Sequence, residues 1–240
     1  MAWRPLSLKE MQQKYLVPGS APVSARLLRR LQRDPRTGVQ RLRKQLQKRL
    51  ERERRERDRI EAMLHFEQVL WRAGVEKIAG VDEVGLGPIA GPVVAAAVVF
   101  PPETKINGID DSKRIDVQSR EELDVEIRRV ALAINVGVVE VDEIDRLNIY
   151  HAGIQAMRIA VLGLAEPPQH VLVDSRVIPD LPQPQNSFNR GDGLNFSIAC
   201  ASIVAKVYRD RLMLELDRTY PGYGFASHKG YCTVAHQRAL

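Results

Sequence analysis

Residues 77–100 of the chain, KIAGVDEVGLGPIAGPVVAAAVVF, determine what kind of fold it can adopt. The segments 77–84 and 93–100 have the length of β-strands. The second contains almost no polar side chain, as is typical of strands buried on both faces. Glycine and proline in the intervening residues 85–92 predict a tight turn. The two strands are therefore expected to form a hairpin at the start of a sheet.

After this hairpin the sequence alternates between helix and strand patterns. We predict these elements in chain order: a helix at 121–129, a strand at 132–140, a helix at 145–164, a strand at 171–174, a proline-rich connection up to Asn189, and a long helix at 194–220. Strands followed by helices, with a hairpin at the start, indicate an α/β domain with a mixed sheet. We expect this domain to occupy residues 74–240.

The first part of the chain has a different character. Residues 18–24 favour a loop, and from Val39 onward apolar residues at helical spacing predict a helix that ends near Ala73-Gly74. The run ERERRERDR at 51–59 places opposite charges four residues apart, which favours a solvated helix. We therefore expect residues 1–73 to form a helical extension.

Charge is distributed unevenly between these two parts. The chain carries a net charge of +6, but residues 1–72 hold 19 Lys and Arg against 8 Asp and Glu, whereas the rest holds 17 against 22. A basic segment joined to a mildly acidic body suggests that the segment meets a polyanion. A solvated helix face is the alternative interpretation of the same charges.

Membrane and secreted proteins are disfavoured. The apolar run 89–100 is too short to span a bilayer, and the N-terminus lacks the pattern of a signal peptide. The cysteines Cys200 and Cys232 have neither metal-ligand spacing nor the look of a disulfide framework. Cys200 lies among small apolar residues, which favours a buried packing role. We expect a cytoplasmic protein with no membrane association.

Three familiar kinds of site find little support. His228 and His236 are too few and too far apart for a zinc site. No Gly-x-Ser-x-Gly segment indicates a serine hydrolase. The glycines at 85 and 87 are not a dinucleotide fingerprint, because the third glycine is misplaced and a strand follows.

Four carboxylates are placed where chemistry could use them. Asp82 and Glu83 end the first strand, Asp174 ends another apolar strand, and Asp192 precedes the long helix, where a helix cap is the alternative role. Neighbours on a strand point to opposite faces, so Asp82 and Glu83 can share a site only if the strand ends or bends there. Buried carboxylates are costly unless a cation balances them, and Mg²⁺ and Mn²⁺ prefer oxygen ligands. Four such acids could hold two ions for in-line phosphodiester cleavage.

The quoted stretch also carries a family resemblance. Residues 80–98, GVDEVGLGPIAGPVVAAAV, resemble the signature opening of ribonuclease HII. The resemblance continues in the same order through DSK at 111–113, NI at 148–149, VLVD at 171–174, GD at 191–192, SIACASIVAKVYRD at 197–210, YPGYGF at 220–225 and HKGYCTVAH at 228–236. It covers nearly all of 74–240. Residues 1–73 resemble the basic N-terminal extension of some bacterial members.

The resemblance implies a ribonuclease H-like fold and a metal-dependent endonuclease. It implies cleavage of the RNA strand in RNA–DNA hybrids and at single ribonucleotides in duplex DNA, leaving 3′-hydroxyl and 5′-phosphate ends, with a role in DNA replication and repair. It implies Mn²⁺ or Mg²⁺ as cofactor. The family's catalytic, metal-holding acids fall on four residues of this chain: Asp82, Glu83, Asp174 and Asp192.

The resemblance also indicates residues for substrate binding. They are Gly85, Leu86, Gly87, Ser112, Lys113 and Tyr231. Backbone groups of the glycine loop could bind the 2′-hydroxyl, which alone distinguishes RNA from DNA at one nucleotide. Lys113 would contact a phosphate, and Tyr231 would stack on the sugar or base.

Two departures from the family pattern leave an alternative open. Leu86 occupies the position of the family's loop arginine, and the chain stops at Leu240, where relatives continue into a basic tail. A hybrid-binding homologue with impaired cleavage is therefore the second hypothesis. In either case we expect a monomer whose partner is an RNA–DNA hybrid or ribonucleotide-containing duplex DNA.

Overall fold

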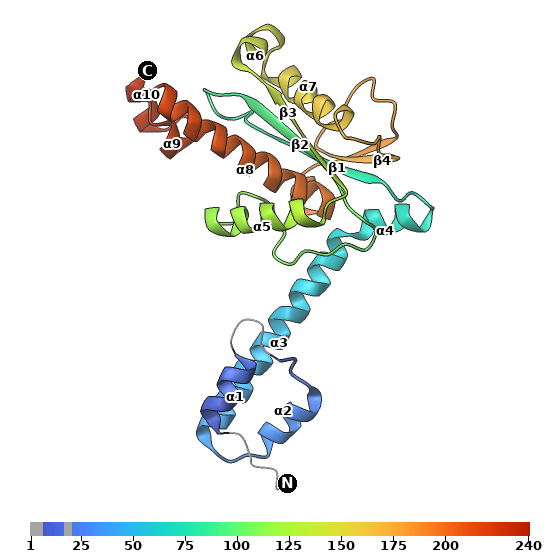
Figure 1. Cartoon of the computed structure of the whole chain (residues 1–240), viewed down its shortest axis with the longest axis vertical. Coiled ribbons are helices and arrows are strands. Elements are labelled where there is room, and N and C mark those ends of the chain that lie inside the picture. Colours follow the sequence, from blue (N-terminus) through green and yellow to red (C-terminus); the bar gives the residue numbers. More distant parts are fainter. Residues whose placement is uncertain (1–6, 17–20) are drawn as a thin grey trace. The chain divides into compact units, whose positions relative to one another are not determined.

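A computed structural model describes residues 7–16 and 21–240 of the chain. The predicted loop at 18–24 lies partly outside these residues. The chain divides into two compact units, Met1–Arg59 and Ile60–Leu240 (Figure 1). The predicted division into a 1–73 extension and a 74–240 catalytic domain remains a prediction.

The N-terminal unit consists of helices around a small core of its own. They are α1 (Leu8–Tyr15), α2 (Ala25–Gln32) and most of α3 (Thr37–Met63). The serines that precede α1 and α2 cap these helices by accepting backbone N–H groups. The stripe of Val39, Leu42 and Leu46 is buried, with Met11 and Leu31 against it. The helical stripe that the sequence predicted is thus confirmed.

The second unit contains a five-stranded mixed sheet in the order β3-β2-β1-β4-β5. The strands are β1 (Ile78–Val84), β2 (Val93–Val99), β3 (Ala133–Val139), β4 (His170–Asp174) and β5 (Gln185–Phe188). Strands β1 to β3 pair antiparallel, and β4 and β5 run parallel to β1. The predicted hairpin and mixed sheet are confirmed.

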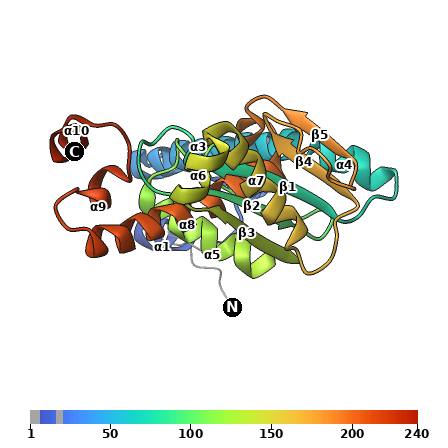
Figure 2. The same cartoon turned by 90° about the horizontal axis from the view of Figure 1, so that it is seen from above.

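Helices cover both faces of this sheet (Figure 2). One face packs on α8 (Phe196–Thr219), which α5 (Val117–Val130) contacts, and the other packs on α7 (Ile149–Leu162). Successive residues of β2 therefore enter different cores: Val94, Ala96 and Val98 face α8, and Val93, Ala95 and Ala97 belong to the other core. This explains why β2 contains no polar side chain.

Glycines allow the helices to approach the sheet closely. A Cβ on Gly80 of β1 would lie 2.1 Å from the backbone carbon of Ser197, and one on Gly137 of β3 would lie 2.1 Å from the carbonyl oxygen of Ala156. These contacts require residues without side chains.

The structure corrects several predicted elements. The predicted helix 145–164 is two helices, α6 (Val141–Leu147) and α7, because Asn148 has a φ of 68° and caps α7 through its side chain. The predicted helix 121–129 begins earlier, at Val117, because Asp116 caps it. The proline-rich connection contains a strand, β5, that the sequence did not predict.

The helix that was predicted to run to residue 73 is also interrupted. α3 ends at Met63, and α4 (His65–Arg72) follows Leu64, whose side chain is fully buried in the core of the second unit. Gly74, with a φ of 83°, follows α4, so the predicted helix end is confirmed. Glu67 of α4 is buried and accepts hydrogen bonds from the backbone and hydroxyl of Ser197, which joins α4 to the start of α8.

The chain ends in two short helices, α9 (Phe225–His228) and α10 (Val234–Ala239). Across residues 7–16 and 21–240, no helix is both long and apolar enough to span a membrane.

Candidate metal centre

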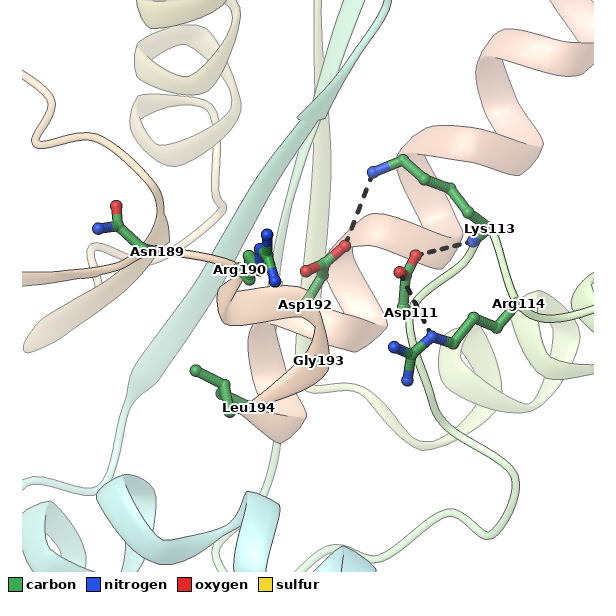
Figure 3. Close-up of a pocket in the computed structure, with 8 residues that line it drawn as sticks. All are labelled: Asp111, Lys113, Arg114, Asn189, Arg190, Asp192, Gly193 and Leu194. Carbon is green, nitrogen blue, oxygen red and sulfur yellow. Dashed lines mark hydrogen bonds and ion pairs between the residues drawn. The ribbon is translucent and has the colours of Figure 1, made fainter.

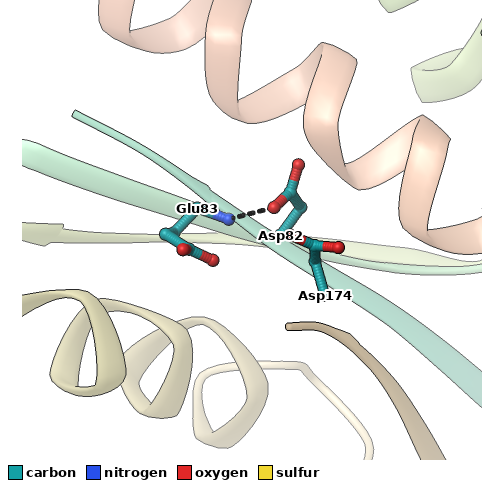
Figure 4. A group of neighbouring side chains, drawn as sticks. All are labelled: Asp82, Glu83 and Asp174. Carbon is teal, nitrogen blue, oxygen red and sulfur yellow. Dashed lines mark hydrogen bonds between the residues drawn. The ribbon is translucent and has the colours of Figure 1, made fainter. Parts of the chain in front are cut away.

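Three of the predicted carboxylates meet at one end of the sheet. Asp82 and Glu83 are consecutive on β1, and Asp174 is the last residue of β4. Each offers an oxygen that lies within 4.8 Å of the others' (Figure 4). The backbone N–H of Glu83 donates to Oδ1 of Asp82 at 2.8 Å, which orients that carboxylate.

The end of β4 explains how neighbours on one strand can share a site. Asp82 lies on the face covered by α8, where the Ser202 hydroxyl interacts with it. Glu83 lies on the α7 face, where its Cγ is 3.8 Å from the point that a Cβ on Gly153 would occupy. Strand β4 ends at Asp174 and β1 ends one residue after Glu83. Carboxylates from both faces can therefore meet at the end of the sheet. This agrees with the expectation that Asp82 and Glu83 share a site only where their strand ends or bends.

Burial and mutual repulsion control the charge of this group. Burial raises the pKa of Asp82 well above its usual range, and the charges of Glu83 and Asp174 raise it further. Burial also raises the pKa of Glu83 to about 7, with Asp174 as second cause, while the charge of Arg176 acts in the opposite direction. Without a cation, the group therefore retains protons near neutral pH.

The carboxylates suit a divalent metal ion. Oε2 of Glu83 is buried and has no hydrogen-bond partner among the described residues. A buried carboxylate oxygen without a partner is costly, and a hard cation with oxygen ligands removes that cost. Asp82, Glu83 and Asp174 can thus hold a divalent cation.

Asp192 lies apart from this group of three. It sits on a short 3₁₀ helix, η1 (Gly191–Gly193), in a pocket of about 500 Å³ (Figure 3). Its Oδ2 is 3.8 Å from Nζ of Lys113. Burial raises the pKa of Asp192, followed by the charges of Asp111 and Asp174.

Asp192 is nevertheless tied to the others and is not a helix cap. The N–H of Gly191 donates to Oδ1 of Asp174 at 2.6 Å, which joins η1 to the end of β4. Asn195 caps α8 by accepting from the N–H of Ile198, so the alternative role of Asp192 as the cap is wrong.

The predicted substrate loop follows β1 directly. Gly85 has a φ of 110°, and a Cβ there would lie 2.7 Å from the carbonyl oxygen of Pro92. Leu86 turns inward, and its Cδ2 lies 2.9 Å from where a Cβ on Gly153 would be. Gly87 faces the ring of Tyr231, whose Cε1 is 3.9 Å from the position that a Cβ on Gly87 would occupy. Gly87 and Tyr231, far apart in sequence, are thus brought together.

The remaining predicted substrate residues differ in exposure. The Ser112 side chain is buried, and its hydroxyl is 2.9 Å from that of Ser202. The Lys113 side chain is 75% exposed. Tyr231 is exposed, with Nζ of Lys206 5.6 Å from its ring centroid. Their roles in substrate binding remain predictions.

Sequence reasoning missed two side chains at the centre. The Ser202 hydroxyl, 2.9 Å from that of Ser112, lowers the pKa of Asp82, and the charge of Arg176 lowers the pKa of Glu83. The position of Arg176, two residues after Asp174, could have indicated that it lies near the carboxylates. The turn that sets the direction of its side chain cannot be predicted from the local sequence pattern. Asp210, the last residue of the 197–210 motif, pairs with Lys206 at 2.7 Å and with Arg120 at 3.2 Å.

Comparisons with known proteins agree with this geometry. The family model described as Ribonuclease HII matches residues 79–240, and the model described as Ribonuclease HII N-terminal domain matches 19–71. The chain is 50% identical to a ribonuclease HII of Myxococcus xanthus, over 98% of this chain and 80% of that protein. It is also 50% identical to one of Geobacillus thermodenitrificans, over 88% of this chain and 81% of that protein.

Solved structures show the same architecture. The ribonuclease H2 of Pyrococcus horikoshii aligns with a TM-score of 0.58 and 27% identity, over 68% of this chain and 83% of that one. The mixed sheet flanked by helices, with its acidic group at the strand ends, defines a ribonuclease H-like hydrolase. Within that class, the chain belongs to the ribonuclease HII family.

Proposed function

We propose that this chain cleaves the RNA strand of RNA–DNA hybrids and cuts at single ribonucleotides in duplex DNA. The observation that carries the proposal is the group of Asp82, Glu83 and Asp174, whose oxygens approach within 4.8 Å, with Asp82 buried and the other two partly buried. A proton-retaining acidic group at the end of a sheet is suited to phosphodiester hydrolysis with divalent cations. The family resemblance supports products with 3′-hydroxyl and 5′-phosphate ends.

The four acids would hold two Mn²⁺ or Mg²⁺ ions. Asp82, Glu83 and Asp174 would hold one ion, and Asp192 would complete the site of the second. When bound, the ions supply Lewis-acid activation of the attacking water and neutralise charge on the phosphodiester. Asp82 and Glu83 would release the protons that they retain in the metal-free protein, so ion binding is coupled to pH.

Substrate selection would come from the loop after β1. Backbone groups of Gly85 and Gly87 would bind the 2′-hydroxyl, and the absence of a side chain on Gly87 leaves room beside the Tyr231 ring, which would stack on the sugar or base. Lys113, exposed beside Asp192, would contact a phosphate.

A nicking assay tests the proposal. A duplex with one ribonucleotide, an RNA–DNA hybrid, and an all-DNA duplex of the same sequence are each incubated with Mg²⁺ or Mn²⁺. We expect metal-dependent cleavage of the first two and none of the third, with 3′-hydroxyl ends that a DNA polymerase extends. Cleavage of the all-DNA duplex at a similar rate would contradict the proposal.

Leu86 supports the second candidate, a hybrid-binding protein with impaired cleavage. Its side chain packs against Gly153 and carries no charge, where the family has arginine. This candidate predicts that the wild-type protein binds the ribonucleotide duplex but does not nick it, and that Leu86→Arg restores nicking. Robust nicking by the wild-type protein excludes it.

We further propose that the basic N-terminal unit binds the duplex backbone. Arg52, Arg55 and Arg57 of α3 are exposed. Changing all three to Gln is expected to flatten the dependence of log affinity on log salt by about 0.9 for each phosphate that the protein no longer neutralises. An unchanged salt dependence would point to a protein partner instead.

We also propose that the protein acts as a monomer in the cytoplasm. The relatives named above are bacterial, and bacterial DNA lies in the cytoplasm.

A further inference from the structure

Arg176 follows the end of β4 through an unusual turn. The N–H of Arg176 donates to the carbonyl oxygen of Asp174 at 2.6 Å, which closes a turn of only three residues. Ser175, between them, has a φ of 57°, a conformation that residues other than glycine rarely adopt. Such conformations persist where surrounding structure holds them, often at functional sites. The turn places Arg176 two residues after Asp174, and its charge acts on Glu83.

Tyr150 supports the Arg176 side chain. The central carbon of the guanidinium lies 4.4 Å from the centroid of the Tyr150 ring. Tyr150 is in the first turn of α7, which the side chain of Asn148 caps. Stacking on an aromatic face holds the guanidinium plane while leaving the N–H groups at its edge available.

The side-chain donors of Arg176 are not used by any of the residues that the structure describes. Its Nη1 is buried without a hydrogen-bond partner, and its side chain makes no hydrogen bond or ion pair among the described residues. Arg209 of α8 shows what a structural arginine does here. It is fully buried and donates to the carbonyl oxygens of Pro92, Lys229 and Ala90 at 2.9, 2.9 and 3.1 Å. Arg176 lacks any comparable set of acceptors in the described part of the chain.

The charge of Arg176 acts on the Glu83 side of the metal centre. It lowers the pKa of Glu83, yet Oε2 of Glu83 has no partner among the described residues either. Two oppositely charged groups are therefore close enough to interact electrostatically without forming an ion pair. Leu86, on the same side, contributes no charge. On the Asp192 side, Lys113 is the corresponding exposed cation.

We propose that Arg176, held on the Tyr150 ring, binds a backbone phosphate of the substrate on the Glu83 side of the metal centre. This inference rests on the proposed function for the identity of the substrate. The guanidinium edge suits two phosphate oxygens, and the contact brings a cation to the side where the family's loop arginine is replaced by Leu86. Phosphate contacts carry no sequence information, so Arg176 contributes affinity and register but does not select RNA.

Binding measured against salt tests this role. The probes are an 18-base-pair DNA duplex with one central ribonucleotide and the all-DNA duplex of the same sequence. Ca²⁺, which also prefers oxygen ligands, occupies the centre. The variants are Arg176→Gln and Arg176→Lys. Arg129→Gln is the matched control. Arg129 is exposed near the end of α5, just before β3. The start of β3 pairs with Val99, at the end of the sheet opposite to the carboxylates.

We expect Arg176→Gln to weaken binding of both duplexes equally, by about five- to tenfold, and to lower the salt slope by about 0.9. Arg176→Lys keeps the slope and loses about two- to threefold, because the charge remains without the planar fork. Arg129→Gln changes neither quantity. Thermal unfolding of each variant checks that it is folded.

The proposal is overturned if folded Arg176→Gln keeps the wild-type affinity and slope. Should that variant not fold, Arg176→Lys decides: a folded Lys variant whose slope drops by about 0.9 refutes a phosphate contact made by charge. If the wild-type protein binds both duplexes in an Arg176-dependent way but never nicks the ribonucleotide strand, the phosphate contact stands and the proposed cleavage fails.

Discussion

The two halves of the metal centre differ in how their charges are balanced. Asp82, Glu83 and Asp174 are crowded at the strand ends, where Glu83 has an oxygen without a partner among the described residues. Asp192 lies in an open pocket beside Lys113, with Arg114 and Asp111 also lining it (Figure 3). The first half therefore repels itself despite the nearby charge of Arg176, whereas in the second half the ammonium of Lys113 lies 3.8 Å from a carboxylate oxygen of Asp192.

This difference indicates which half depends more on a metal ion. Burial is the main cause of the raised pKa values in the group of three, and mutual repulsion adds to it. A divalent cation relieves both costs at once. At Asp192, Lys113 already relieves part of the cost. We therefore expect substitutions in the group of three to have larger consequences than substitutions in the pocket.

The largest expected effect is that of Asp82→Asn. Losing a ligand from the group of three should lower the nicking rate by about a thousandfold or more, since metal-ion catalysis supplies several kcal/mol. Single-turnover rates on a one-ribonucleotide duplex with Mn²⁺ measure it. Asp145→Asn, the same change at an exposed position of α6, should leave the rate unchanged. A near-wild-type rate for Asp82→Asn would refute the assigned centre.

Asp192→Asn should have a smaller effect. Because Asp192 is partly neutralised by Lys113, we expect the rate to fall by about ten- to a hundredfold, equivalent to about 1.4–2.7 kcal/mol. Titration with Mn²⁺ should show that the tighter ion-binding step is retained. If Asp192→Asn is as inactive as Asp82→Asn, the two halves are not functionally different.

Glu83→Gln should stabilise the metal-free protein at high pH. The folded pKa of Glu83 is about 7 against a usual value of 4.5, so the unfolded chain ionises first. Stability is then lost as pH rises from about 4.5 to 7, and the whole penalty is present above 7. At pH 8 we expect Glu83→Gln to exceed wild type by about 1–3 kcal/mol, and near pH 4.5 to equal it. Urea unfolding in EDTA measures this difference.

The exposed Glu140→Gln, on the same unit, is the control and should show no such pH dependence. Adding Mg²⁺ at pH 8 should reverse the order, because only wild type keeps all ligands for the ion. A Glu83→Gln protein that is less stable than wild type in EDTA at pH 8 would contradict the claim that ionised Glu83 destabilises the metal-free protein.

Lys113→Gln should have the smallest effect. The side chain is 75% exposed, so we expect the nicking rate to fall by only about two- to fivefold and the salt slope of binding to fall by about 0.9. The acid limb of the pH–rate profile should also move to higher pH, because Lys113 no longer lowers the pKa of Asp192. An unchanged acid limb would show that Lys113 does not influence the ionisation of Asp192 during the reaction.

Most of the sheet could be predicted from local patterns, but two helix boundaries could not. The apolar spacing of 145–164 continues through Asn148, whose positive φ breaks the helix. The pattern of residues 39–73 likewise continues through Leu64, where burial in the second unit's core interrupts it. The spacing of apolar residues predicts which face of a helix is buried. It does not predict a break in the helix when the apolar spacing continues across the break.

The same limit applies to the candidate site. Asp82, Glu83 and Asp174 were recognisable because acidic residues at the ends of apolar strands are unusual. The meeting of Gly87 with Tyr231 and of Ser202 with Ser112 depends on residues that are far apart in the sequence. No local pattern contains that information.

The sequence by itself determined strands β1 to β4 and the main helices between them, burial of β2 on both faces, and four acids of the kind that binds hard cations. These follow from side-chain chemistry and short-range periodicity. Tertiary structure alone decided that three of the acids converge while Asp192 stays beside Lys113. It also decided that Leu86 turns inward onto Gly153 and that the guanidinium of Arg176 lies over the ring of Tyr150. The reason is that strand register and single residues at positive φ set the direction of these side chains, and both are decided by packing across the sheet.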